Sequence, residues 1–192
     1  MTNTLNNSNL FKVNKKITSL EEDNNIKNDN DININELDNN YTLWYHNPND
    51  TNWNTDSYHQ IITISTIPEF WILNTFINKD MIINGMFFLM RDDIIPIWEN
   101  NENKNGGYIS WKISNDKAYD TWIDLCGHIL TNEFNINQFI NGISISPKKY
   151  FNIIKIWTNS PINVSDIKMP ENFILKNEKP IFKLHNKNLE KK

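Results

Sequence analysis

The chain has 192 residues, a formal net charge of −4 and a mean hydropathy of −0.59, a length that suffices for one well-buried domain but not for two of ordinary size. Its single cysteine, Cys126, excludes an internal disulfide and a multi-cysteine metal site, and no apolar run approaches the roughly 18 residues of a membrane-spanning helix. Four lysines and seven acidic residues lie within residues 1–40, which leaves the rest of the chain nearly neutral, so any binding of nucleic acid must use a specific pocket rather than a basic groove.

Residues 1–38 consist mainly of Asn, Asp, Lys and Glu, with scattered Ile and Leu. Because so few apolar side chains cannot offset the entropy of ordering, we expect a disordered tail here and one folded domain at residues 39–192. The first residues lack the charged-then-apolar pattern of a signal peptide, and the lone cysteine indicates a reducing compartment. The abundance of Asn and Ile indicates an AU-rich coding sequence, such as that of a parasite or a large DNA virus.

The predicted domain begins with two strands joined by a polar loop. Residues 41–45 and 59–64 are rich in aromatic and β-branched side chains, which favour strands. Between them, the turn sequence at residues 47–50 opens a polar loop that carries Trp53.

A helix follows the second strand. Thr66 and Glu69 form the Thr-x-x-Glu pattern of a capping box, and a proline between them is tolerated in the first helical turn. Helical periodicity predicts that one face is buried against the sheet, formed by Phe70, Leu73 and Ile77.

The middle of the chain predicts further strands. Residues 86–90 form one of them, and the apolar run at residues 94–99 predicts a second that ends in Trp98 and Glu99. A polar, glycine-containing loop at residues 100–107 follows this second run.

The second half of the chain contains the other predicted helix and the remaining strands. Ser114 is expected to cap a helix whose buried residues recur at helical spacing, namely Trp122, Leu125, Cys126 and Ile129. Strands are predicted at 108–113, 142–146, 152–158 and 181–184, with a short helical stretch at 164–169. Strands joined by hairpins with helices between them indicate an α+β fold, in which one antiparallel sheet carries helices on one face.

Three side chains suggest a specific ligand. Trp53 lies among polar neighbours, and Trp98 is followed directly by Glu99. A 7-methylated guanine is cationic, so two indole faces can bind it by stacking and cation–π attraction, while a carboxylate accepts its two parallel N–H donors. The alternatives are that Trp53 folds back over its own loop, that Trp98 belongs to the core and that Glu99 is merely solvated.

Six segments resemble the translation initiation factor 4E family in order and approximate spacing. They are residues 41–45, Trp53, 68–71, 96–99, 103–107 and 154–158, so the similarity covers about residues 41–160. The resemblance implies a curved antiparallel sheet with about three helices on its convex face. It also implies that Trp53 and Trp98 sandwich the mRNA cap, that Glu99 accepts hydrogen bonds from the guanine edge and that Trp157 contacts the N7-methyl group, although a core position for Trp157 fits the sequence equally well.

The positions that match the family's triphosphate-binding residues differ in this chain. Tyr108 replaces an arginine after the Gly-Gly pair, Lys148 replaces a second arginine, and Ile153 replaces a lysine. Lys149 or Lys155 are possible compensating cations, and strand alternation places Lys155 on the face of Trp157.

Tyr150 lies in the turn beside these lysines. We expect weaker triphosphate contacts than in the family, and a ring such as Tyr150 stacked on the first or second transcribed nucleotide. Ordinary strand packing of this ring is the alternative.

A second surface is predicted around Trp71. Ile67 and Trp71 form an apolar stripe separate from the buried face of their helix. By resemblance, Trp71 receives a helix from a scaffold factor of the 4G type or from a repressor that mimics it, and Ile67, Ile123 and Leu37 match flanking apolar positions. The His-Pro pair that the family has upstream is absent here.

The sequence indicates no enzyme and no cofactor, because its four histidines lack metal-binding spacing and it contains neither a nucleophile motif nor a phosphate-binding glycine loop. Three hypotheses follow: a cytoplasmic cap-binding initiation factor, monomeric apart from its scaffold; a cap-binding repressor or decoy; or an interaction module that has lost the cap. The pair of tryptophans and Glu99 argue against the third, and Trp71 favours the first over the second.

Overall fold

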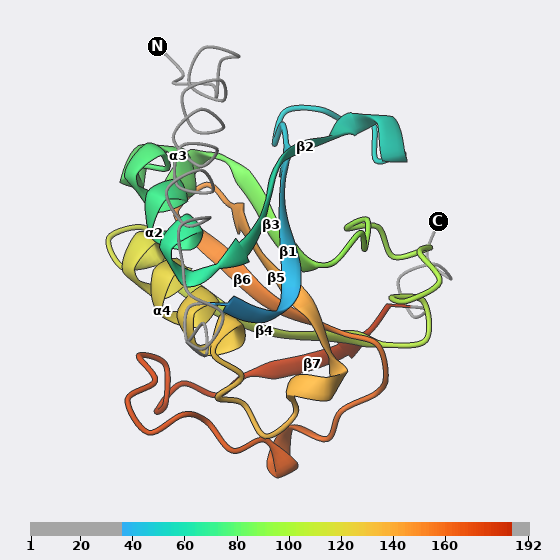
Figure 1. Cartoon of the computed structure of the whole chain (residues 1–192), viewed down its shortest axis with the longest axis vertical. Helices are drawn as coiled ribbons and strands as arrows, with labels where there is room; N and C mark the ends of the chain where they lie inside the picture. The colour runs from blue at the N-terminus through green and yellow to red at the C-terminus, as the bar shows by residue number, and fades with distance from the viewer. Residues whose placement is uncertain (1–35, 186–192) are drawn as a thin grey trace, which may run out of the picture.

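The computed structural model describes residues 36–185, which form a seven-stranded antiparallel sheet in the order β2-β1-β3-β5-β6-β4-β7. The strands are β1 (Glu36–His46), β2 (Tyr58–Thr66), β3 (Met86–Arg91), β4 (Gly107–Ser114), β5 (Ile140–Pro147), β6 (Phe151–Thr158) and β7 (Ile181–Leu184). The helices are α2 (Ile67–Phe76), α3 (Lys79–Asn84) and α4 (Ala118–Leu130), with single 3₁₀ turns η1 (Thr55–Ser57), η2 (Asn137–Phe139) and η3 (Val164–Asp166). Figure 1 shows the three helices together on one side of the curved sheet, which confirms the predicted α+β architecture.

The expected tail lies mostly outside the described residues. Its last part does not, because β1 already begins at Glu36, where it pairs with Thr66 of β2. The strand reaches this far because a bulge between Glu36 and Tyr41 lets a polar, weakly patterned segment stay in register with its neighbour. No helix among residues 36–185 is long and apolar enough to cross a membrane.

The two faces of the sheet have different roles, because alternate side chains of each strand point to opposite sides. On the helix side, residues such as Leu43, Leu89, Ile143 and Ile156 join the main core, and each is at most 1% exposed. On the open side, a smaller buried cluster consists of Phe88, Met90 and Trp157. The open side is therefore available for a ligand, with an aromatic floor already in place.

Helix α2 starts as the sequence predicted. The Thr66 hydroxyl accepts a hydrogen bond from the Glu69 backbone N–H, while the Glu69 carboxylate accepts from the Thr66 backbone, which completes the capping box. Phe70, Leu73 and Ile77 are buried against the sheet, as expected, although Ile77 is the cap residue that follows the helix.

Two helical details differ from the predictions. Helix α3 was not predicted, because its six residues are too few to show helical periodicity; Asn78 caps it through the Met81 backbone N–H. Ser114 is not the cap of α4 but the last residue of β4, and its carbonyl accepts from the Lys117 N–H in a turn that leads to the helix. The short helical stretch predicted at residues 164–169 is confined to η3.

The predicted strand at residues 94–99 is absent, and this segment belongs to an irregular loop between β3 and β4. The buried Asn103 explains the difference, because its amide donates to the carbonyls of Ile95 and Ile97 at 3.1 and 2.9 Å. These carbonyls are thereby satisfied without a neighbouring strand. Asn103 in turn accepts from the Asn141 side chain of β5 at 2.9 Å, which fixes the loop to the sheet.

Candidate functional site

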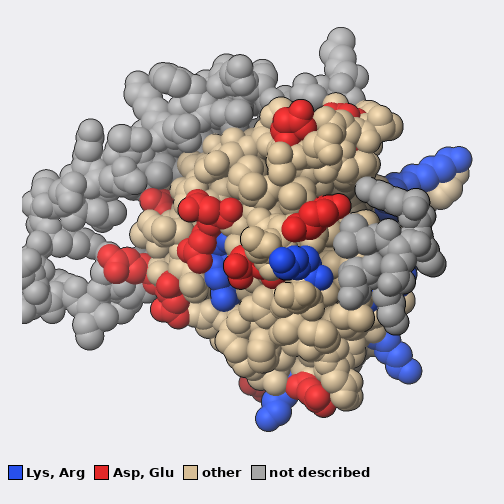
Figure 2. Space-filling view, turned by 90° about the vertical axis from the view of Figure 1, so that its right-hand side faces the viewer, with Lys and Arg blue, Asp and Glu red and all other residues tan. Residues whose placement is uncertain are grey.

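A cavity of about 1010 Å³ opens on the face of the sheet away from the helices, between the loop that follows β1 and the loop that follows β3. Its wall consists of Thr51, Asn52, Trp53, Asn54, Thr55, Tyr58, Met86, Phe88, Ile97, Trp98, Glu99, Ser144, Ser146, Lys148, Lys155 and Trp157. Figure 1 shows both loops on the right of the sheet, and Figure 2 views the molecule from that side. On the part of this face that the structure describes, acidic and basic side chains lie interspersed, without a continuous basic surface.

Trp53 is held at the rim by a loop built from successive side-chain-to-backbone turns. The Asn52 N–H donates to the Asp50 carboxylate at 2.8 Å, and the Asn54 N–H donates to the Asn52 side chain at 2.9 Å. Trp53 stacks flat on His46, with ring centroids 4.3 Å apart and an interplanar angle of 4°. Because its side chain is still 48% exposed, one indole face is supported while the other faces the cavity.

His46 is itself fixed from two sides. It is fully buried, its Nε2–H donates to the Asn52 carbonyl at 2.8 Å, and its ring contacts Tyr58 at a centroid distance of 4.8 Å. Trp53 therefore does pack against its own domain, as the alternative supposed, but it packs on a histidine of β1. The same ring also lines the cavity.

Trp98 and Glu99 enter the cavity from the loop that Asn103 fixes. Trp98 is half-buried and Glu99 is exposed, so neither belongs to the helix-side core. The Glu99 carboxylate lies near the Tyr58 hydroxyl, whose pKa rises to about 12, mainly through burial and further through the negative charge of Glu99. The cavity thus brings together the three side chains that the sequence singled out, Trp53, Trp98 and Glu99.

Trp157 forms the floor of the cavity. It is 2% exposed, and its indole N–H donates to the Ser144 hydroxyl at 2.9 Å. The edge-on ring of Phe88 lies at a centroid distance of 6.2 Å. Trp157 is thus buried as a core residue would be, but on the cavity side of the sheet.

The cationic side of the cavity contains Lys148 and Lys155. The Lys155 ammonium lies 4.3 Å from the ring centroid of Tyr108, the residue that replaces an arginine. Burial, and then the positive charges of Lys148 and Lys183, lower the pKa of Lys155 to about 8. A partly desolvated ammonium that faces two further cations favours an anionic ligand.

Two predicted site residues lie outside the cavity wall. Lys149 and Tyr150 are in the turn between β5 and β6, where Tyr150 is 73% exposed and the Lys149 ammonium lies 5.0 Å from its ring centroid. Ile153, which replaces a lysine of the family, is half-buried and also outside the wall.

Sequence reasoning missed several residues of the site. Ser144 and Ser146 alternate with buried isoleucines along β5, a pattern that could have placed both on the face of Trp157. Tyr58, His46 and His185 carried no such signal, because their positions depend on contacts between segments distant in sequence.

His185 closes the site behind the two inner tryptophans. It is fully buried, 4.8 Å from the Trp157 ring and 6.4 Å from the Trp98 ring between centroids. Burial, assisted by the charge of Lys155, lowers its pKa to about 4, so this ring is neutral at physiological pH. It therefore adds apolar support without a competing positive charge.

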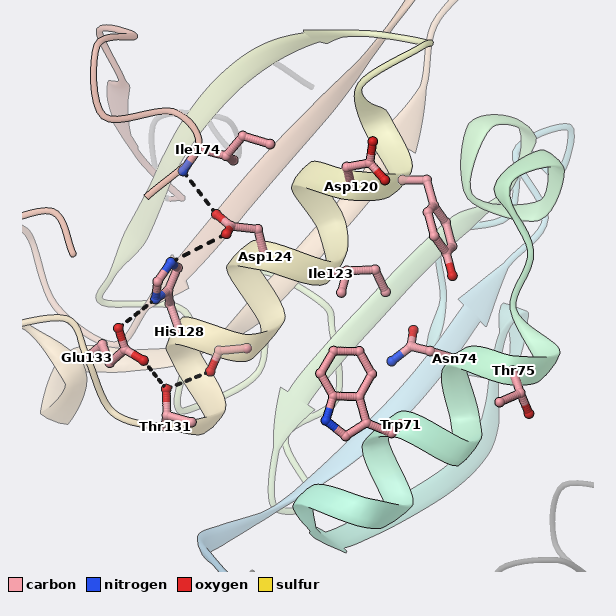
Figure 3. Close-up of a pocket in the computed structure, with 12 residues that line it drawn as sticks. Trp71, Asn74, Thr75, Asp120, Ile123, Asp124, His128, Thr131, Glu133 and Ile174 are labelled. Carbon is pink, nitrogen blue, oxygen red and sulfur yellow. Dashed lines mark hydrogen bonds and ion pairs between the residues drawn. The ribbon is translucent and has the colours of Figure 1, made fainter. Parts of the chain in front are cut away.

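A second hollow, of about 750 Å³, lies between α2 and α4 (Figure 3). Its wall consists of Trp71, Asn74, Thr75, Tyr119, Asp120, Ile123, Asp124, Gly127, His128, Thr131, Glu133 and Ile174. Trp71 is 56% exposed and faces Ile123 across this groove. Ile67 and Leu37 instead pack against the main core and are outside the wall.

A cluster of polar contacts around His128 closes one end of this groove. His128 lies 2.8 Å from the Glu133 carboxylate and 3.5 Å from the Asp124 carboxylate, and Asp124 also accepts from the Ile174 backbone N–H at 3.1 Å (Figure 3). This cluster ties the segment before β7 to α4 and leaves the groove with an acidic rim.

Comparison with known sequences identifies one family. The model of the family described as eukaryotic initiation factor 4E matches residues 36–192. Eukaryotic translation initiation factor 4E of Eremothecium gossypii is 28% identical over 132 residues, which cover 65% of this chain and 62% of that protein. Factor 4E-1 of Hordeum vulgare is 31% identical over 66% of this chain and 61% of its own length. The match thus spans less than two thirds of these relatives.

A viral relative and two solved structures extend the comparison. The initiation factor 4E homolog of Acanthamoeba polyphaga mimivirus is 39% identical over 64 residues, 31% of this chain and 24% of that protein. Caenorhabditis elegans eIF4E-3, in complex with the 4E-binding protein Mextli and a cap analog, superimposes with a TM-score of 0.67 at 17% identity, over 82% of this chain and 96% of that one. Ascaris suum eIF4E-3 in complex with an m7G cap gives 0.60 at 20% identity, over 68% and 77% of the two chains. The structural similarities show a common fold.

Proposed function

The chain belongs to the eukaryotic initiation factor 4E family, and from this premise we propose that it binds the 7-methylguanosine cap of mRNA and recruits capped mRNA for translation initiation. The observation that carries the proposal is the presence of Trp53, Trp98, Glu99 and Trp157 in the wall of one cavity. A related protein, Ascaris suum eIF4E-3, has been crystallised with an m7G cap. The cap is a ligand here, and no reaction is part of the proposal.

The base half of the cap fits the aromatic side of the cavity. The cationic 7-methylguanine inserts between the indoles of Trp53 and Trp98, where stacking and cation–π attraction act together. The Glu99 carboxylate accepts hydrogen bonds from the guanine N1–H and N2–H. Adenine cannot form this charge-assisted pair. Trp157 lies below, where it contacts the methyl group.

The triphosphate half meets lysines in place of arginines. Lys148 and Lys155 line the cavity, and the Lys155 ammonium is already desolvated and repelled by neighbouring cations, so a phosphate relieves an existing electrostatic strain. Because an ammonium lacks the planar fork of a guanidinium, these contacts give less directional binding than two arginines would. We assign the compensating role to Lys155 rather than Lys149 in this proposal, because Lys155 lines the cavity and Lys149 does not.

Fluorescence titration of the full chain with 7-methyl-GTP, and with unmethylated GTP as competitor, tests the cap proposal. We expect Trp98→Ala and Glu99→Gln each to weaken binding by about 5- to 150-fold, because each removes a contact worth about 1–3 kcal/mol. Trp71→Ala is the matched control, since it removes an exposed tryptophan from the other face. Equal affinity for methylated and unmethylated nucleotide would contradict the proposal.

Recruitment requires a second surface, and we assign it to the groove of Trp71 and Ile123. Its apolar centre and acidic rim of Asp120, Asp124 and Glu133 fit an amphipathic partner helix with basic residues beside its apolar ones. Such a helix would belong to a 4G-like scaffold or to a binding-protein repressor; Caenorhabditis elegans eIF4E-3 forms a complex with the 4E-binding protein Mextli. Ile67 and Leu37 would then act from outside the groove, by supporting α2 and β1.

The alternative is a cap-binding repressor or decoy, which holds the cap without productive recruitment. Purification on cap resin from the source cells separates the two possibilities. A large scaffold that co-purifies and is lost in Trp71→Ala supports recruitment, whereas cap binding without any Trp71-dependent scaffold supports a decoy.

A further inference from the structure

Three lysine–aromatic pairs lie on the open face of the sheet. The Lys155 ammonium is 4.3 Å from the Tyr108 ring centroid, and the Lys112 ammonium is 4.2 Å from that of Phe151. The third pair, Lys149 over Tyr150 at 5.0 Å, occupies the turn between β5 and β6. Of these six residues, only Lys155 lines the cavity already described.

Strand register places the first two pairs in one row, and the third pair lies in the turn at the end of that row. In the ladder of β4 and β6, Tyr108 is opposite Trp157 and Lys112 is opposite Ile153. Since every second residue of a strand points to the same face, Trp157, Lys155, Ile153 and Phe151 follow one another along β6 on the cavity side. At about 3.4 Å per residue, the row extends roughly 20 Å from the cavity floor to Phe151.

We propose that this row, the lysine–aromatic track, binds the first nucleotides that follow the cap in a capped RNA, with Phe151 and Tyr150 as stacking surfaces and Lys112 and Lys149 as phosphate partners. The inference rests on the proposed cap function, because the track begins where the cap triphosphate would leave the cavity. Its ligand class is single-stranded RNA of any sequence, since every base has a face that can stack on an aromatic ring.

Exposure of the rings increases along the track, from Tyr108 at 8% to Tyr150 at 73%. A tyrosine that packs into its own domain is not normally so exposed, so Tyr150 is available to an external planar group. Phe151 is half-buried, with one side covered by the Lys112 side chain. The outer rings are thus anchored in the sheet hairpin but open to a ligand.

Within residues 36–185, no carboxylate forms an ion pair with Lys112, Lys149 or Lys155. Alternation of cations with flat rings, in continuity with a cavity suited to a nucleotide, favours a nucleic-acid strand over an acidic peptide, which would gain nothing from the rings.

The test compares a bare cap analogue with capped RNAs that carry one, two and four nucleotides, measured by titration of the full chain. We expect affinity to rise about tenfold with the first nucleotides, since one base stacked on a ring is worth about that factor. Tyr150→Ala and Lys112→Gln should each remove much of this gain and leave the affinity for the bare analogue unchanged. Tyr119→Ala on α4 and Lys168→Gln near η3 are matched controls on other surfaces.

Salt dependence provides a second readout. Each phosphate contact with single-stranded RNA contributes about −0.7 to the slope of log affinity against log salt, so Lys112→Gln should make the slope of the four-nucleotide RNA shallower by about that amount. Equal affinity for the bare analogue and the longer RNAs, or a gain that survives Tyr150→Ala and Lys112→Gln, overturns the track and leaves the cap function intact. The track proposal is also overturned if a polyglutamate peptide displaces the RNA extension as effectively as uncapped RNA displaces it. Failure of the unmodified chain to bind even the bare analogue overturns both proposals.

Discussion

Replacement of Asn103 by alanine should loosen the loop that carries Trp98 and Glu99. The Asn103 side chain is fully buried and makes three hydrogen bonds, two to the carbonyls of Ile95 and Ile97 and one from Asn141. At about 1 kcal/mol for each, and with the two carbonyls left in a site that excludes water, the loss of unfolding free energy should be about 3 kcal/mol. For a domain of this size that corresponds to a fall in Tm of about 6–12 °C.

The same substitution should weaken binding of 7-methyl-GTP, because the energy required to order the loop is then taken from the binding free energy. Differential scanning fluorimetry and fluorescence titration measure the two effects on one sample. Asn101→Ala is the matched control, since Asn101 is exposed, lies in the same loop and bonds only the Lys104 side chain among the described contacts. If Asn103→Ala behaves like Asn101→Ala in both assays, the loop is held by something other than this hydrogen-bond network.

Three further predictions follow from single contacts. Because the pKa of Lys155 is about 8 rather than 10.5, cap-analogue affinity should decline as pH rises above 8, and Lys155→Met should make that decline shallower in a titration series. The charged form of Lys155 opposes folding, so Lys155→Met should also raise Tm at pH 7. Gly106→Ala should lower the unfolding free energy measured in urea by at least about 1–3 kcal/mol, since its Cβ would lie 1.7 Å from the Thr158 carbonyl oxygen. Glu69→Ala removes the acceptor for the Ser65 and Thr66 backbone N–H groups, so it should lower the unfolding free energy by about 2 kcal/mol. An unchanged urea midpoint would contradict the capping role.

Local signals account for the parts of the fold that the sequence predicted well. The capping box of Thr66 and Glu69 positions α2, and strand alternation in β5 and β6 determines which side chains face the helices. The short helix α3 was missed because six residues show no periodicity, whereas the wrongly predicted strand at residues 94–99 reflects satisfaction of backbone groups over long range. Ile95 and Ile97 look like strand residues by composition, but Asn103 satisfies their carbonyls, and Asn103 in turn depends on Asn141 in a distant strand.

The residues of the candidate site also fall into two groups, those that the sequence could single out and those that it could not. The sequence could single out Trp53, Trp98 and Glu99 as candidates, because two flat rings and a carboxylate are what a cationic purine would require; all three line the same cavity. The support behind them was not predictable. His46 stacks under Trp53, and His185 lies behind Trp98, only because strands distant in sequence meet there.

Lys155 is the residue that we propose to supply a cation that the 4E family has at another sequence position. The resemblance to the 4E family implies an arginine where β4 carries Tyr108, so a comparison by position records a lost cation. Tyr108 is opposite Trp157 in the β4–β6 ladder, and the next residue of β6 on that face is Lys155. Its ammonium lies 4.3 Å from the Tyr108 ring, within the cavity wall. In the proposed cap site, Lys155 would therefore supply from the neighbouring strand the positive charge that Tyr108 lacks, and the Tyr108 ring would hold its ammonium in place.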